Sequence, residues 1–219
     1  MILRPFLTLS LLGSLLPLAS RAQSTSASPR YYVGSSGNQL SNVPFNGDGI
    51  VPRIIGPGLT VGLQLTPRLA VQTGLSYHWK KDSLATYQFI PSPGNASTVT
   101  MTSRVKYFIV PALLRYTATA PTARARFDIL GGATLVHATG RISYEGNGGT
   151  IDPALRDRSS SNTRLNLTLG PAVRATLSPR LELTAAGLLS AVVSEDYYRF
   201  SDRLFLNTSF GLNYTFGQL

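Results

Sequence analysis

The chain has few residues of the kinds that perform acid–base or metal chemistry. It contains two histidines, His78 and His137, and no cysteine, which excludes disulfides and thiolate metal sites. It also lacks a phosphate-binding glycine loop, a histidine pair at metal-ligand spacing and a nucleophile elbow. We therefore expect no catalytic residue, no metal and no cofactor, and we interpret the protein as non-enzymatic.

His78 carries the one catalytic alternative. Ser76 precedes it by two residues and Asp82 follows it by four, and a serine, a histidine and an acid can together hydrolyse an ester. Two residues apart on one strand is a poor geometry for such a set, because the residues are displaced along the strand by about 6–7 Å. We expect His78 to be a histidine at the rim of the strands, in water or among lipid head groups, and ester hydrolysis remains an alternative.

Arg174 and Glu182 are the clearest candidates for a buried pair of opposite charges. They flank the short segment Ser178-Pro179-Arg180, which is typical of a tight turn. If that turn joins two antiparallel strands, Thr176 lies opposite Glu182 and Arg174 lies on its diagonal. We predict an interior ion pair with a structural role; a proton or ion path is the alternative.

Alternation with period two predicts the elements that hold these residues. Apolar residues fall at 59, 61, 63 and 65 and again from Leu69 to Trp79, on either side of Thr66-Pro67-Arg68. The pattern recurs on both sides of the 178–180 turn and near the C-terminus. Such alternation indicates strands with two unlike faces.

The whole pattern predicts an all-β chain of eight antiparallel strands. Their expected ranges are 31–38, 55–65, 69–80, 103–117, 123–138, 163–177, 181–194 and 203–217. Connections after the second, fourth and sixth strands are short, whereas 39–54, 81–102, 139–162 and 195–202 are longer. Strict alternation of short turns and long loops is typical of an up-and-down transmembrane β-barrel. Pro111 and Pro171 fall inside strands, where we expect bulges.

The two faces of these strands differ in a way that favours a membrane barrel over a soluble one. One face is apolar, while the other carries small residues, amides and a few charges such as Gln72, Asn166 and Asn213. A narrow eight-stranded barrel can hold such polar residues inside, and lipid can cover the apolar face. We expect Leu165, Leu167, Leu206 and Leu212 to point outward.

Aromatic residues gather near the expected strand ends, as in the two aromatic belts of membrane barrels. The expected belt residues are Tyr77, Trp79, Tyr107 and Phe205 at one end, and Tyr116, Phe127, Tyr214 and Phe216 at the other.

The N-terminus has the parts of a secretory signal. A basic start at Arg4 is followed by an apolar stretch from Phe6 to Leu18 and then by Ser20-Arg21-Ala22. We predict a signal peptide at 1–22, cleavage after Ala22 and a single barrel domain at 23–219. No long apolar run follows, so a membrane-spanning helix is not expected.

The chain is basic, with a formal charge of +10, but its bases are scattered. Nucleic acid is not expected as a partner of an exported chain, and anionic lipid is a better one. The basic residues expected at the external rim could bind lipopolysaccharide phosphates: Arg53, Lys80, Lys81, Arg104, Lys106, Arg141, Arg164, Arg199 and Arg203.

Two segments carry a family resemblance. Tyr107-Phe-Ile-Val-Pro-Ala-Leu-Leu-Arg-Tyr116 resembles a strand motif of PorT-like proteins in the outer-membrane β-barrel domain family, and Phe210 to Phe216 resembles a C-terminal signal read by barrel-insertion machinery. The chain departs from that signal by ending Gly217-Gln218-Leu219. The resemblance implies a bacterial outer-membrane location, eight strands and the insertion machinery as a partner. Members have varied roles, and one branch is linked to protein secretion.

Together these features predict an outer-membrane barrel whose long external loops serve surface contact or assembly scaffolding. The alternatives are a narrow transport channel, a lipid-modifying enzyme acting through His78, and a soluble lipocalin-like carrier with an apolar lumen. The oligomeric state, the external ligand and any link to a secretion system are not determined by the sequence.

Overall fold

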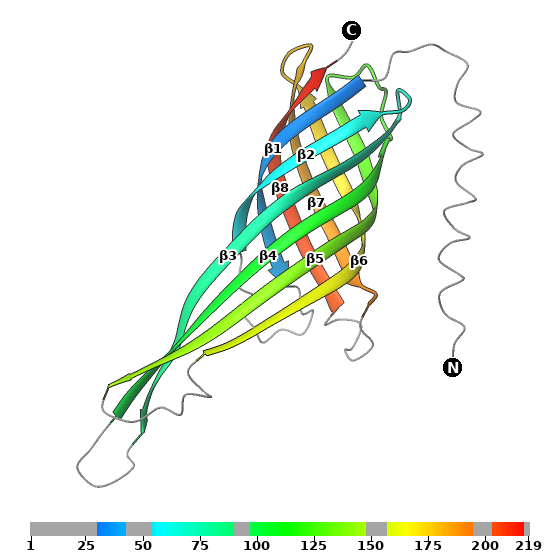
Figure 1. Ribbon diagram of the computed structural model, residues 1–219. Coiled ribbons are helices and arrows are strands. Elements are labelled where there is room, and N and C mark those ends of the chain that lie inside the picture. Colours follow the sequence, from blue (N-terminus) through cyan, green and yellow to red (C-terminus); the bar gives the residue numbers. More distant parts are fainter. Residues whose placement is uncertain (1–29, 43–53, 90–96, 148–156, 195–202, 217–219) are drawn as a thin grey trace, which may run out of the picture.

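In a computed structural model, the protein is a closed β-barrel of eight antiparallel strands in sequence order (Figure 1). The structure describes residues 30–42, 54–89, 97–147, 157–194 and 203–216. The predicted signal peptide lies outside these residues. Each strand pairs with the next, and β1 closes the barrel by pairing with β8. Among the described residues, no helix is long and apolar enough to cross a membrane.

The eight strands are β1 (Arg30–Asn42), β2 (Ile54–Gln64), β3 (Leu69–Phe89), β4 (Ser97–Thr117), β5 (Ala125–Asn147), β6 (Asp157–Thr176), β7 (Leu181–Val192) and β8 (Leu204–Phe216). The prediction of eight antiparallel strands is therefore confirmed. The short turns after β2, β4 and β6 lie at the end of the barrel where β1 begins and β8 ends, and we name this the turn end.

The four central strands are much longer than the sequence pattern predicts. The pattern assigns the segments 81–102 and 139–162 to loops, but most of their described residues extend β3, β4, β5 and β6. Alternation there is hidden, because serine, threonine and charged residues occupy both faces and no apolar face marks the strand. Backbone pairing with the neighbouring strand continues all the same.

These extensions form a four-stranded sheet that projects from the barrel beyond β1, β2, β7 and β8 (Figure 1). We name it the projecting sheet; it comprises residues 80–89, 97–106, 139–147 and 157–164. The ladder between β2 and β3 ends at Gly58 and Ser76, and the ladder between β6 and β7 ends at Asn166 and Val192. Beyond these points β3 and β6 pair on one side only.

The barrel has an apolar outside. Leu165, Leu167, Leu206 and Leu212 point outward as predicted and are 45%, 59%, 37% and 42% exposed. Isoleucine, valine, phenylalanine and further leucine side chains are exposed in the same way around the barrel. This arrangement differs from that of a soluble lipocalin-like barrel, whose apolar side chains would fill the lumen.

The interior is mixed, with a small apolar centre among polar residues. Leu113, Leu130 and Ala172 form a buried cluster, against which Ala186 and Leu188 pack. The interior also holds buried polar residues, among them Asn38, Thr134, Asn166, Thr168 and Asn213. Small and polar side chains of this kind fill the narrow lumen of an eight-stranded barrel.

Candidate functional site

The interior at the turn end is occupied by a cluster of charges. Asp128 on β5 and Arg174 on β6 face inward, as does Glu182 on β7. Arg126 lies opposite Arg174 in the register, and Thr117 lies opposite Asp128. We name these five residues the ion cluster. The 118–124 turn sets the register of β4 and β5, and the 178–180 turn sets that of β6 and β7. Pairing of β5 with β6 then brings the two hairpins side by side, so that same-face residues near the turns meet in the lumen.

Arg174 is the centre of the ion cluster. Its Nε and Nη2 donate to the two carboxylate oxygens of Asp128, the latter over 3.1 Å, while its Nη1 donates to Glu182 Oε2 over 2.9 Å. Nη2 also reaches Thr117 Oγ1 at 3.0 Å. Asp128 is fully buried and Arg174 is 4% exposed. Charges taken out of water in this way need both a partner and further hydrogen bonds, and both are present.

Thr117 and Arg126 supply the remaining hydrogen bonds and ion pair to the two carboxylates of the ion cluster. Thr117 Oγ1 donates to Asp128 Oδ1 over 2.7 Å. Arg126 Nη2 forms an ion pair with Glu182 Oε1 and a 3.0 Å hydrogen bond with Thr176 Oγ1. Two carboxylates and two guanidinium groups therefore cross-link β5, β6 and β7 from inside the barrel.

A second group of side chains extends this closure across β1 to β4. Arg115 Nη2 donates to Gln64 Oε1 over 2.9 Å, and its guanidinium lies 4.6 Å from the centre of the Tyr32 ring. The Tyr32 hydroxyl donates in turn to Gln72 Oε1 over 2.9 Å. Gly62 lies opposite Tyr32, and a Cβ there would overlap its ring. The tyrosine ring therefore occupies the space that the absent side chain leaves.

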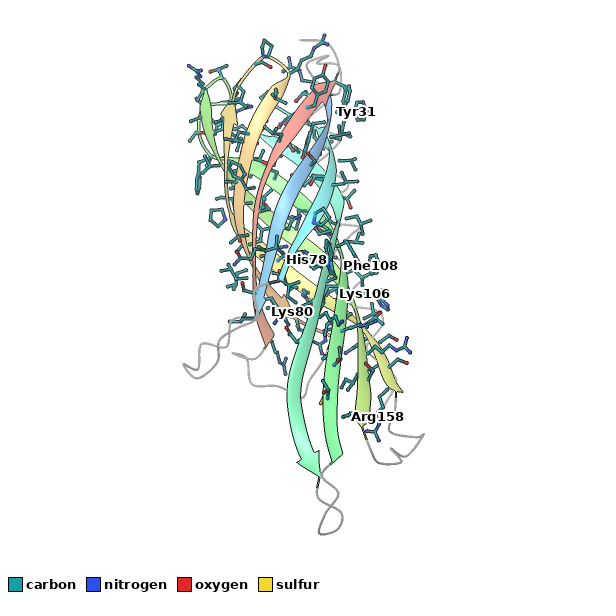
Figure 2. The ribbon with its side chains drawn as sticks, turned by 90° about the vertical axis from the view of Figure 1, so that its left-hand side faces the viewer. Tyr31, His78, Lys80, Lys106, Phe108 and Arg158 are labelled. Atoms are coloured by element: carbon teal, nitrogen blue, oxygen red, sulfur yellow. The ribbon has the colours of Figure 1, made fainter. Side chains whose placement is uncertain are left out.

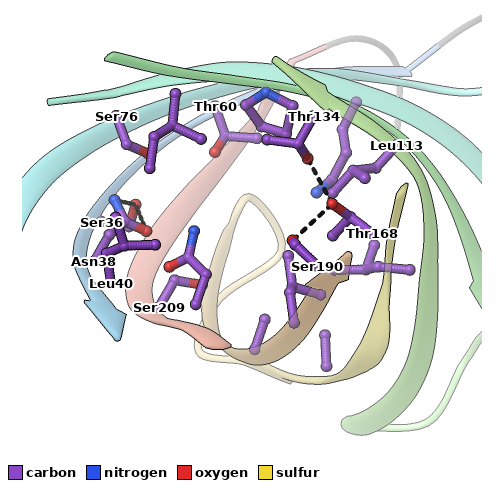
Figure 3. A pocket seen from close by; sticks show the side chains of 18 of the residues that line it. Ser36, Asn38, Leu40, Thr60, Ser76, Leu113, Thr134, Thr168, Ser190 and Ser209 are labelled. Carbon is purple, nitrogen blue, oxygen red and sulfur yellow. Dashed lines mark hydrogen bonds between the residues drawn. The ribbon is translucent and has the colours of Figure 1, made fainter. Parts of the chain in front are cut away.

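A cavity of about 160 Å³ lies in the lumen between this closure and the rim of the projecting sheet. Its wall carries a chain of hydroxyls, in which Thr134, Thr168 and Ser190 are joined by hydrogen bonds of 2.8 Å (Figure 3). Arg115, Asp128 and Arg174 line one limit of the cavity, and Leu40, Arg164 and Phe205 are also among its lining residues. The arrangement can hold water or a small polar solute.

His78 does not form the catalytic set that the sequence leaves open. Its side chain is fully buried, and its Nδ1 lies 3.2 Å from Ile54 O. Asp82 is engaged with Lys80 over 2.7 Å. Among the described side chains, no hydrogen bond joins Ser76 to His78. The expectation of a solvated histidine at the rim is wrong for His78, since its even-numbered position faces the interior.

His137 is on the outer face, opposite Phe108 and Thr163. Its ring nitrogens lie 2.8 Å from Thr163 Oγ1 and 3.4 Å from Thr139 Oγ1. Within the described ranges, no three His, Asp or Glu side chains gather in a way that could hold a metal ion.

The nine residues predicted as a basic rim do not form one surface. Lys81, Arg104, Lys106 and Arg141 are exposed on the outer face of the projecting sheet. Lys80 is on the other face of the sheet beside Asp82, and Arg164 lines the lumen. The expectation that these two belong to the basic rim is wrong, because alternation along the strand turns their side chains away from the outer face. Arg203 is half-buried at the start of β8, and Arg53 and Arg199 lie outside the described residues.

Two members of the predicted aromatic belts are also corrected. Tyr107 and Phe205 line the lumen cavity. Tyr77 packs outside against Trp79 and Phe108, with ring centres 5.4 Å and 4.8 Å apart. Tyr107 cannot share that face, because neighbours in a strand point to opposite sides. The belt residues predicted at the turn end are all exposed: Tyr116, Phe127, Tyr214 and Phe216.

The sequence pattern finds Arg174 and Glu182 but misses three members of the ion cluster. The structure brings those two residues together as an ion pair, and Arg174 also pairs with Asp128. Arg126 and Asp128 could be assigned to an inner face from alternation alone. Their contact with β6 and β7 could not be predicted from alternation. It depends on the register between β5 and β6, two strands that extend far beyond the barrel before a long connection joins them.

Comparisons with known proteins bear on the fold. No protein-family model and no curated protein matches the chain. Among solved structures, it is similar to a major outer membrane protein from Thermus thermophilus, with a TM-score of 0.56, 13% identity, and coverage of 87% of this chain and 100% of that one. Others are Ail of Yersinia pestis (TM-score 0.48, 14% identity, 86% and 97% covered) and Neisserial surface protein A (0.47, 13%, 85% and 97%). The chain therefore has the closed antiparallel β-barrel fold found in solved outer-membrane proteins, and the Thermus structure carries this conclusion.

Proposed function

We propose that this chain is a non-enzymatic bacterial outer-membrane β-barrel protein whose projecting sheet makes contacts outside the cell. The observation that carries the proposal is the apolar outer surface of the barrel, joined to a polar sheet that extends past it. Exposed leucine, valine and phenylalanine side chains cover the barrel strands. Water would not tolerate so large a continuous apolar surface, whereas lipid would cover it.

The projecting sheet supports the second half of the proposal. Its residues are mainly serine, threonine, lysine and arginine, so it belongs in water. It also replaces the long loops expected from the sequence with a paired sheet that presents two defined faces. A paired sheet presents its side chains on two faces at regular spacing, which favours a role in contact or scaffolding over that of a spacer.

The location is tested by cell fractionation and by migration on a gel with and without heating. We expect the protein in the outer-membrane fraction, with the folded barrel running faster than the heat-denatured chain. Recovery of the folded protein from the aqueous fraction without detergent would contradict the proposal. The predicted signal peptide is tested by sequencing the N-terminus of the exported protein, where Gln23 is expected to come first.

A narrow channel is the second candidate, and the lumen cavity above the ion cluster is the observation that favours it. The observation against a channel is that the cavity is bounded at the turn end by hydrogen-bonded side chains, those of Arg115, Asp128 and Arg174. We therefore expect no stable conductance steps from the purified protein in planar bilayers. Reproducible single-channel steps would favour transport over surface contact.

A lipid-modifying enzyme is a weaker alternative, because His78 is buried against Ile54 O. It predicts hydrolysis of phospholipid by the purified protein that is lost in His78→Ala. The resemblance of Tyr107–Tyr116 to PorT-like proteins and the use of barrel-insertion machinery by the Phe210–Phe216 segment remain parts of the proposal.

A further inference from the structure

The outer face of the projecting sheet carries a row of cations next to the aromatic belt. In the strand register, Lys81 on β3 lies opposite Arg104 on β4, and Arg104 lies opposite Arg141 on β5. All three side chains are exposed. Residues that face each other across antiparallel strands have Cβ atoms about 4.5–5.5 Å apart, and like charges placed directly opposite each other destabilise a sheet. The sequence nevertheless places three in succession.

The neighbouring rows define where this charge lies. Two residues closer to the barrel on the same face, Lys106 lies opposite Trp79. Two residues closer again, Phe108 lies opposite Tyr77. In Figure 2, Phe108 and Lys106 lie close together where the sheet leaves the barrel. Aromatic belts mark the head-group level of a membrane, and a same-face step along a strand is about 7 Å. The cation row therefore lies at or just beyond the head groups.

The two faces of the sheet differ in whether their cations have a carboxylate partner. On the opposite face, Lys80 is paired with Asp82 over 2.7 Å. On the outer face, no described carboxylate lies within ion-pair distance of Lys81, Arg104 or Lys106. These three cations can therefore bind an anionic group that the described part of the chain does not supply.

We propose that Lys81, Arg104, Lys106 and Arg141 form a docking site for the phosphate groups of an anionic glycolipid in the outer leaflet. This inference rests on the proposed membrane location. Phosphate accepts hydrogen bonds from several donors at once, and a planar guanidinium can bind it through two parallel bonds. Trp79 and Phe108 would contact the apolar part of the same lipid, so the site recognises a phosphate joined to acyl chains.

The test uses Trp79, the only tryptophan in the chain, as an internal reporter. The full protein is folded in phosphatidylcholine nanodiscs, diphosphorylated lipid A is titrated in, and Trp79 fluorescence is followed. The test variant is Lys81→Gln/Arg104→Gln. The control is Lys80→Gln/Arg158→Gln, which removes the same charge from the opposite face of the same sheet.

We expect the test variant to weaken apparent lipid A affinity at least tenfold and the control less than twofold. Wild-type affinity should also fall with rising salt. Equal weakening by both variants, equally tight binding of dephosphorylated lipid A, or equal saturation by inorganic phosphate would each overturn the lipid site. Heat-modifiable migration of every variant is measured alongside: if the wild-type protein fails to insert, the membrane location itself is wrong, whereas insertion without phosphate selectivity refutes this site alone.

Discussion

Asp128 is the residue around which the interior charges are arranged. It is fully buried, and it accepts hydrogen bonds from Arg174 and from Thr117. Glu182 shares Arg174 with it and is held from the other side by Arg126. Removing one partner from such a buried network leaves an uncompensated charge, which costs more than the pair contributes when intact.

We predict that Asp128→Ala lowers the free energy of unfolding by about 3–5 kcal/mol. The reason is that Arg174 would keep Glu182 but lose the carboxylate on its Nε side. The measurement is urea unfolding of the protein folded in phosphatidylcholine vesicles. Asp82→Ala is the control, since it breaks the partly exposed pair with Lys80 and should cost only about 0–1 kcal/mol. Equal effects of the two variants would show that the ion cluster does not stabilise the barrel.

At the scale of the strand, proline and glycine interrupt the ladders without shifting them. Pro171 falls opposite Gly187, and the β6–β7 register is the same on both sides of that gap. Pro111 falls opposite Gly74 with the same result on the β3–β4 side. The expectation of bulges at these prolines is therefore wrong. A proline lacks the N–H for one ladder bond, but it does not add a residue, so the face assignments survive. The register shift between β3 and β4 lies instead at Ser83 and Ala85.

Gly170 and Gly187 provide a matched test of how closely the strands approach beside Pro171. A Cβ at Gly170 would overlap the carbonyl oxygen of Gly187, whereas a Cβ at Gly187 has no atom within 4 Å. We predict that Gly170→Ala destabilises the barrel by about 1–3 kcal/mol, as overpacking does, while Gly187→Ala changes stability little. Midpoints of urea unfolding distinguish them. Similar midpoints for the two variants would mean that the strands separate freely at Pro171.

At the scale of the molecule, the barrel reverses the usual placement of polar and apolar residues. Leucines cover the outside, while hydroxyls, amides and the ion cluster occupy the lumen. In lipid this is the stable arrangement, because no solvent is present to satisfy polar groups on the outer face. The cost of an outward charge should then depend on its depth in the bilayer.

We predict that Leu169→Arg costs roughly 2–4 kcal/mol and Leu177→Arg about 0–1 kcal/mol in vesicles. The two leucines are similarly exposed, at 62% and 54%, but Leu169 lies well inside the barrel part of β6, whereas Leu177 adjoins a turn. Because their exposure is alike, a barrel in water would respond alike to both changes. Equal unfolding free energies for the two variants would therefore argue against a bilayer around the barrel.

The orientation of the barrel can be read with single cysteines, since the natural chain has none. We predict that Arg158→Cys, in the projecting sheet, reacts with a membrane-impermeant maleimide on intact cells. Arg68→Cys, exposed in the turn after β2, should react only after the cells are opened. The reverse result would place the projecting sheet in the periplasm and would remove the proposed external role.

The sequence by itself determined the barrel strands and their faces. Apolar residues at every second position of Leu165–Leu169 and Phe210–Tyr214, with small or polar residues between them, are enough to assign an outside and an inside, because a strand has period two. It also placed Arg174 near Glu182, because a short turn fixes the register of its own hairpin. Tertiary structure decided the rest. Asp128 and Arg126 join that pair only once β5 is set beside β6, and the cation row at Lys81, Arg104 and Arg141 exists only because three strands extend in register through segments with no apolar face. Contacts between strands joined by long connections depend on barrel closure, which leaves no mark in local alternation.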